Sequence, residues 1–159
     1  MSWKARCTKY IEYFRFFIIF LAIFISNYLA AHPVEAFHYM AILIIIGFSG
    51  TIAFEGLILG EFASAKIGYT PSRAYQVQSA LYSLAITIAA IISFVLNWGL
   101  FADLTIITVL SSFLVLSSTN HAYTAIKDKN YKITNILRPI MTLAFLAIII
   151  PMMLKAINY

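Results

Sequence analysis

Five long apolar stretches, separated by short polar or proline-containing stretches, dominate the pattern along this chain. A helix that crosses a bilayer needs about 20 mostly apolar residues, and each stretch has close to that length. Pro33 and Pro71 lie in two of the gaps, which fits because the residue before a proline avoids helical geometry. The pattern predicts an all-α membrane bundle with transmembrane helices at roughly 14–31, 37–63, 75–98, 100–123 and 136–157.

Small and polar residues recur on single faces of three of these segments. Lipid gives helices no hydrophobic reason to associate, so such faces are expected to form helix contacts. Segment 37–63 carries the GxxxG pair Gly56 and Gly60. The faces of segments 75–98 and 100–123 consist of Ser79, Ser83, Thr87, Ala90, Ser93 and Asn97, and of Thr105, Thr108, Ser112 and Thr119. We expect these faces to serve helix packing, and the alternative is that they line a polar path.

The first segment differs, because it consists almost entirely of Phe, Ile and Leu before Ser26 and Asn27. We therefore expect one transmembrane domain in which residues 1–36 form a basic segment and a peripheral anchor helix, and residues 37–159 form a four-helix core. A basic stretch before an apolar stretch is also typical of a secretory signal peptide. We favour an uncleaved anchor.

Composition agrees with this assignment. The chain has 159 residues, of which 62% are apolar and 11% charged, and its mean hydropathy is +0.90. Soluble domains are nearer to about half apolar and about a quarter charged. The net charge of +5 does not indicate nucleic-acid binding, because the basic residues flank apolar stretches. A single cysteine, Cys7, excludes an intramolecular disulfide and a cysteine-based metal cluster, although its basic, aromatic surroundings permit palmitoylation.

The basic residues alternate between the two sides of the predicted bundle. The first and third connections have none, whereas the N-terminal stretch and the second and fourth connections hold Lys4, Arg6, Lys9, Arg15, Lys66, Arg73, Lys127, Lys129, Lys132 and Arg138. Because Lys and Arg are retained on the cytoplasmic side, this distribution predicts a cytoplasmic N-terminus and an outer C-terminus. In a bacterium this would be the inner membrane.

Glu55 is the residue whose position is hardest to explain by lipid contact alone. It lies about two turns inside the cytoplasmic end of its segment, where an ionised carboxylate is costly unless it faces protein or water. It either carries a proton, pairs with a neighbour in a structural polar contact, or serves as a proton, cation or ligand site. Glu61 is expected at the interface near Lys66 or Arg73.

Asn120 and His121 end the fourth segment on the same side as Glu55, so they are candidates for the same site. The candidate ligand or proton residues are Glu55, Glu61, Gln76, Gln78, Asn120 and His121. They show no ligand spacing typical of zinc, so we predict no metal site. His32 and His38, in the outer connection, are expected to be solvated. The sequence contains no nucleophile or cofactor motif and identifies no cofactor.

The stretch from Glu61 to Ala85 resembles an uncharacterised family of small four-helix bacterial membrane proteins that is distantly DoxX-like. The pattern is an acidic residue, an alanine, Ile-Gly-aromatic and then an aromatic-Gln pair. Its members here are Glu61, Ala63 or Ala65, Ile67-Gly68-Tyr69 and Tyr75-Gln76, with Asn120-His121 matching a later histidine. The resemblance covers segments two to five and makes the first segment an addition. Glu55 and Gln78 depart from the pattern.

The motif also has a structural interpretation as a helical hairpin. Gly68 would end the helix in a left-handed conformation. Gln76 or Gln78 would bind the carbonyls freed at the turn.

Taken together, these features favour a non-enzymatic membrane protein: an accessory subunit, or a bundle that binds a lipid-like small molecule in a polar pocket on the cytoplasmic side. The alternatives are a small transporter or proton or cation pathway that uses Glu55, and a subunit of a quinone-linked oxidoreductase. The expected partners are the lipid bilayer and either further copies of the chain or a larger membrane complex.

Overall fold

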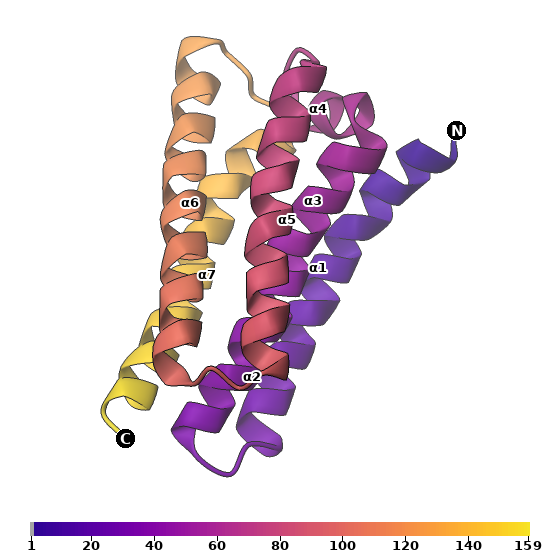
Figure 1. Cartoon of the computed structure of the whole chain (residues 1–159). Coiled ribbons are helices and arrows are strands. Elements are labelled where there is room, and N and C mark those ends of the chain that lie inside the picture. The colour runs from indigo at the N-terminus through magenta and orange to yellow at the C-terminus, as the bar shows by residue number, and fades with distance from the viewer. Residues whose placement is uncertain (1) are drawn as a thin grey trace.

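The computed structural model describes residues 2–159 and is an all-α bundle (Figure 1). It contains five helices long and apolar enough to cross a membrane, which confirms the predicted fold class. Its elements are α1 (Trp3–Tyr28), α2 (Pro33–Ile45), η1 (Ile46–Gly50), α3 (Thr51–Phe54), η2 (Glu55–Leu59), α4 (Glu61–Ile67), α5 (Arg73–Val95), α6 (Leu100–Lys127) and α7 (Ile133–Ile157).

Several helices extend beyond the predicted apolar segments. α1 already begins at Trp3, because the Ser2 side chain accepts a hydrogen bond from the amide of Ala5 and caps it. α6 continues to Lys127, and α7 begins at Ile133. Apolar length marks the part of a helix suited to lipid, whereas the helix itself ends where capping and turn residues end it.

The second transmembrane helix is one continuous rod from Pro33 to Leu59 that contains two wide π-helical turns, η1 and η2. It ends at Gly60, whose φ of 49° and ψ of −112° turn the chain before α4. The predicted segment continued to residue 63, so it ran through this break. Of the GxxxG pair, Gly56 packs against Ala80 of α5, whereas Gly60 forms the turn.

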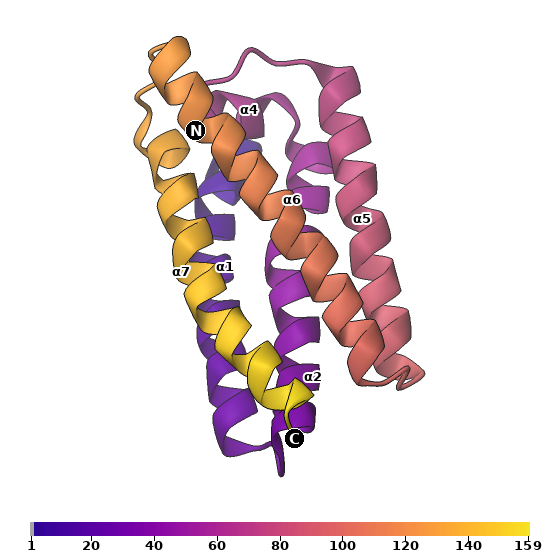
Figure 2. The ribbon, with the colours of Figure 1, turned by 90° about the vertical axis from the view of Figure 1, so that its left-hand side faces the viewer.

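The α2 rod occupies the centre of the bundle and packs against α1, α5, α6 and α7. The largest fully buried apolar side chains gather around it: Phe37, Met40, Ile44, Ile45, Ile107, Leu110 and Ile149. Figure 2 shows α6 crossing the bundle obliquely, close to α5 at one end and close to α7 at the other. This crossing separates α5 from α6 at the end that holds α4.

Most of the polar face predicted for segment 75–98 lies inside the bundle, whereas Asn97, its last member, is exposed beyond the end of α5. Ser83, Thr87 and Ser93 are buried, and the Ser49 hydroxyl donates to the Ser83 carbonyl at 2.9 Å. The corresponding prediction for α6 was wrong. Thr105, Thr108, Ser112 and Thr119 are exposed, and the three threonines donate to carbonyls of their own helix. A hydroxyl satisfied within its own turn is compatible with a lipid-facing position, so these two faces do not line one common path.

α1 packs along α2 with one face and exposes the other. Ile18 and Ala22 are buried, and Gly47 of η1 leaves the space that Ile18 fills. The opposite face presents exposed aromatic residues, among them Phe17, Phe20 and Phe24. α1 therefore lies at the edge of the bundle, while its buried face contributes to the interior.

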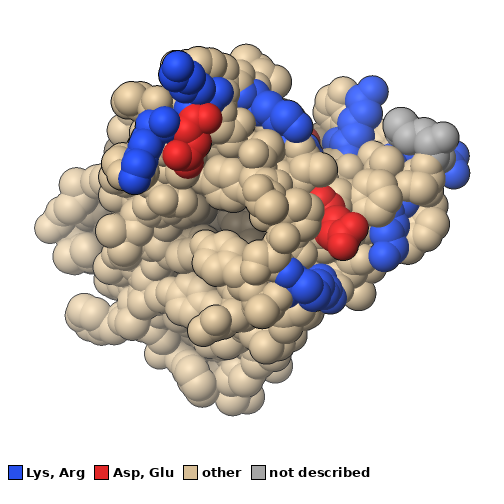
Figure 3. Space-filling model, turned by 90° about the horizontal axis from the view of Figure 1, so that it is seen from above, with Lys and Arg blue, Asp and Glu red and all other residues tan. Residues whose placement is uncertain are grey.

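The two termini lie at opposite ends of the bundle, as an odd number of crossings requires (Figure 1). Figure 3 looks down on the end that holds α4 and the α6–α7 connection. Lys and Arg side chains lie along the upper edge and the right-hand side of this view, and the face is hollowed near its centre. The end with the N-terminus is thus the basic end, which is the distribution from which a cytoplasmic position was predicted.

Candidate functional site

Glu55 lies in a buried cluster of four charged side chains at the basic end of the bundle. Its Oε2 is 2.5 Å from Nη2 of Arg15, and its Oε1 is 2.6 Å from Nζ of Lys66. Both cations also contact Oε1 of Glu12, at 3.0 Å from Arg15 Nη1 and 2.7 Å from Lys66 Nζ. Glu55 is 6% exposed and Arg15 3%. Two cations against one carboxylate favour its ionised form, so Glu55 is an ion-paired residue of the interior.

The sequence interpretation missed Arg15, which was counted only as a topology signal. It is the second residue of the predicted segment 14–31 and follows Glu12 at i, i+3, a spacing that pairs side chains on one helix face. A residue of α3 orients the Arg15 side chain further, because Nε of Arg15 donates to the Thr51 hydroxyl at 2.8 Å. The sequence does contain a signal for this role, because a charged residue at the edge of an apolar segment needs a partner when it is buried.

Lys66 reaches Glu55 because the chain turns at Gly60. The turn folds α4 back along the bundle, which brings Lys66 close to both α1 and the α2 rod. The expected pairing of Glu61 with Lys66 or Arg73 is absent among the described residues, and Glu61 is exposed. Arg73 instead donates to the Gly56 and Leu57 carbonyls, at 2.6 Å and 2.8 Å.

His121 is held in one orientation by Asn135, a fully buried residue that the sequence interpretation did not single out. The Asn135 amide nitrogen donates to the carbonyls of Asn130 and His121, at 2.9 Å and 3.3 Å, so its oxygen must accept. That oxygen is 2.7 Å from Nδ1 of His121. Nδ1 therefore carries a hydrogen, and Nε2 has a lone pair whenever the ring is neutral. The Tyr69 ring stacks on the imidazole with its hydroxyl 3.0 Å from Nδ1.

The turn after α4 has the geometry predicted for Gly68, whose φ is 80°. The freed carbonyls of α4 are bound by the α6–α7 region, since Asn130, Lys132 and Thr134 donate to Ile67, Ala65 and Lys66. The expected role of the glutamines in binding these carbonyls was wrong. The Gln76 amide donates to the Ser64 hydroxyl, and Gln78 is exposed without a side-chain hydrogen bond to any described residue.

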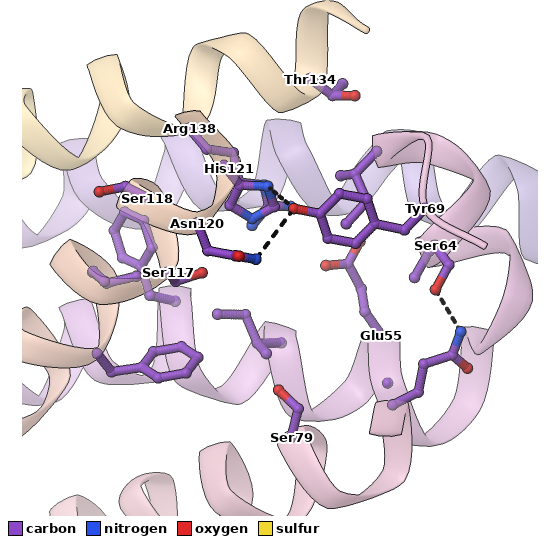
Figure 4. A pocket seen from close by; sticks show the side chains of 18 of the residues that line it. Glu55, Ser64, Tyr69, Ser79, Ser117, Ser118, Asn120, His121, Thr134 and Arg138 are labelled. Atoms are coloured by element: carbon purple, nitrogen blue, oxygen red, sulfur yellow. Dashed lines mark hydrogen bonds between the residues drawn. The ribbon is translucent and has the colours of Figure 1, made fainter. Parts of the chain in front are cut away.

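A cavity of about 630 Å³ lies between these groups, lined by α1, the α2 rod, α4, α5, α6 and α7 (Figure 4). Four of the six predicted site residues line it, namely Glu55, Gln76, Asn120 and His121. Glu61 and Gln78 do not. Apolar side chains such as Phe113, Leu116 and Met141 form much of the remaining lining, and hydroxyl side chains such as Ser79 and Ser117 lie among them. We refer to the charged and amide side chains, together with His121, as the polar wall of the cavity.

Arg138 completes the polar wall. It projects from the second turn of α7, lines the cavity, and is labelled near His121 in Figure 4. Within residues 2–159, the guanidinium of Arg138 forms neither an ion pair nor a hydrogen bond. In the sequence it was counted with the basic residues of the fourth connection.

A second, smaller cavity of about 190 Å³ is lined entirely by apolar side chains of α1, α2, η1 and α7. It shares Phe16, Phe48 and Met141 with the larger cavity. The two spaces are therefore neighbours that meet at a common wall.

The opposite end of the bundle holds another buried polar cluster. Asp103 of α6 is 6% exposed, and its two oxygens are 2.6 Å from Nδ1 of His38 and 3.2 Å from the Ser93 hydroxyl. Phe94 stacks on the His38 ring at 4.7 Å. The expectation of a solvated His38 was wrong, because His38 contacts Asp103 of α6, and Asp103 in turn accepts from Ser93 of α5. The sequence interpretation did not single out Asp103. His32 caps α2 by accepting from the Glu35 amide.

Among the described residues no three His, Cys, Asp or Glu side chains converge on one point.

Comparison with known proteins gives one result. A family model described as "Family of unknown function (DUF6790)" matches residues 9–159. This agrees with the expected uncharacterised family, while the distant DoxX-like relationship and a bacterial origin stay predictions. The match includes most of α1, which corrects the expectation that this helix is an addition to the family pattern. No curated protein and no solved structure matches the chain.

Proposed function

The chain belongs to DUF6790, a family of unknown function, and from its own cavity we propose that it binds an amphiphilic, lipid-like small molecule without transforming it. The observation that carries this proposal is the cavity of about 630 Å³, whose lining combines the polar wall with apolar and hydroxyl side chains. Sites for small molecules typically measure about 300–1,000 Å³ and combine a mostly apolar lining with a few convergent polar groups.

The geometry of Glu55 supports binding over a proton or cation pathway. Both of its carboxylate oxygens are engaged by cations, and those cations are held in turn by Glu12 and Thr51. A carboxylate that relays protons must exchange partners, and this one is fixed from two sides. Its position supports a structural role, that of tying α1, the α2 rod and α4 together beside the cavity.

The first experiment is to extract the protein with its native lipids and record its intact mass before and after lipid removal. We expect one added amphiphile that survives mild extraction. Ser117→Trp should prevent its retention, because Ser117 lines the cavity and the indole would fill part of it. Ser112→Trp is the matched control on the same helix, since Ser112 is exposed and does not line the cavity.

A bare wild-type chain, or equal loss from both tryptophan variants, would contradict the proposal. Other outcomes would support the alternatives. A co-purifying partner chain would favour an accessory subunit, and a bound quinone or flavin would favour an oxidoreductase subunit. Proton flux in liposomes that disappears in Glu55→Gln would favour a transport pathway.

A further inference from the structure

Resting on the proposed function, we propose that the bound amphiphile carries an anionic headgroup, a phosphate or a carboxylate, that pairs with Arg138. Its apolar chain extends into the smaller cavity between α1 and α7.

The first argument is the charge balance of the polar wall. Glu12 and Glu55 are both paired with Arg15 and Lys66, so these four side chains neutralise one another through four ion pairs. Arg138 adds a fifth charge within electrostatic range of Glu12 and Glu55, and because both carboxylates are already paired, the group as a whole keeps one surplus positive charge. An ionised side chain within a transmembrane helix is costly unless it is paired or reaches water, so this surplus positive charge favours an anion in the cavity.

The second argument is the chemistry of the groups beside Arg138. A guanidinium offers five N–H donors in a planar fork that matches the oxygens of a carboxylate or a phosphate. Asn120 has only one long contact, 3.5 Å to the Tyr69 hydroxyl, which leaves its amide free to donate. His121, fixed by Asn135, presents its Nε2 lone pair and can accept from a protonated phosphate oxygen. A cation with two neutral polar neighbours suits a compact oxyanion better than a bulky neutral headgroup.

The third argument is that the smaller cavity lies directly beside the larger one, since Phe16, Phe48 and Met141 belong to both linings. In the proposed complex, the apolar chain of an amphiphile bound at Arg138 passes between these shared side chains. The smaller cavity has no polar lining and measures about 190 Å³, which suits a single hydrocarbon chain. The chain thus contributes apolar packing, and the headgroup gives selectivity.

The test uses delipidated, full-length protein in a neutral maltoside detergent, titrated calorimetrically with three probes. Hexadecyl phosphate and hexadecanol share a chain and differ in charge, and inorganic phosphate has no chain. We expect hexadecyl phosphate to bind about tenfold or more tightly than hexadecanol, because a charge-assisted hydrogen bond is worth at least one such factor.

Arg138→Gln should remove this preference and leave hexadecanol binding unchanged, and Arg138→Lys should restore part of it. Lys127→Gln, an exposed basic residue at the same end, should keep the preference. Ala144→Phe, which fills the smaller cavity, should weaken both chain probes, whereas Ala147→Phe, which lies on α7 outside that lining, should not. Thermal unfolding of each variant confirms that it is folded before its affinity is interpreted.

The outcomes distinguish selectivity for an anionic headgroup from amphiphile binding in general. Equal binding of the two chain probes by folded wild-type protein, or a preference that survives Arg138→Gln, overturns the anionic headgroup and leaves amphiphile binding standing. Absence of binding by both chain probes overturns both proposals. If inorganic phosphate alone binds as tightly as hexadecyl phosphate, the site is one for a free anion and the inferred chain position is wrong.

Discussion

At the scale of single residues, the interior charges are arranged as pairs. Arg15 contacts Glu12, Thr51 and Glu55 while almost no part of it is exposed, so it connects α1 with α3 and with the first residue of η2. A buried pair of this kind contributes little net stability compared with a well-packed apolar replacement, but removal of one partner leaves a buried charge without compensation.

Arg15→Gln should therefore lower the free energy of unfolding by about 3 kcal/mol. Thermal unfolding in detergent should show a clear drop in Tm, and replacing both partners, as in Arg15→Met with Glu55→Leu, should recover most of the loss. Lys9→Gln is the control on the same helix, because Lys9 is exposed. An equal Tm for Arg15→Gln and wild type would contradict the structural role assigned to this residue.

At the scale of elements, the second transmembrane helix determines where the cavity can form. Its π-helical turns place Gly47, Gly50 and Gly56 within contact of neighbouring helices, and its last turn ends with the Gly60 amide donating to the Glu55 carbonyl at 2.9 Å. Such wide turns are frequent at functional sites. Gly60 then redirects the chain, so that α4 closes one side of the cavity and delivers Lys66.

Gly60→Ala should destabilise the protein by about 2 kcal/mol, because its positive φ is strained for any residue with a Cβ. Gly50→Ala should be neutral or slightly stabilising, since its backbone is helical and a Cβ there would be 3.6 Å from Thr87, an ordinary contact. The Tm values of the two variants in detergent test whether the turn before α4 requires a glycine at position 60. Equal Tm values for the two alanine variants would contradict this role of Gly60.

At the scale of the whole molecule, the charge asymmetry and the separation of the termini define an orientation. The α4 end and the α6–α7 connection carry the basic residues, and the C-terminus lies at the other end (Figures 1 and 3). The cavity and its polar wall belong to the basic end, so a cytoplasmic location of this end would give the bound amphiphile access from the inner leaflet.

The predicted orientation can be read by cysteine labelling, because Cys7 is the only native cysteine. In a Cys7→Ser background, Lys129→Cys in intact cells should resist a membrane-impermeant maleimide, and Asn158→Cys should react. Both should react after permeabilisation, which is the control for accessibility. The reverse pattern in intact cells would place the N-terminus outside and invert the predicted topology.

The sequence by itself determined the fold class, the number of helices long and apolar enough to span a membrane, and four of the residues that line the cavity. Apolar length follows from the thickness of the bilayer, which acts on every helix separately, and so it can be read locally. The polar faces could be read only in part, because the residues of the α5 face are mostly buried and those of the α6 face are exposed. The partners of the charges were decided only by tertiary structure. Glu55 meets Arg15 across 40 positions and His121 meets Asn135 through the return of α7, while Arg138 is left without a partner because the other cations occupy both carboxylates. Pairing depends on which helix faces turn toward one another, and local patterns along the chain do not contain that information.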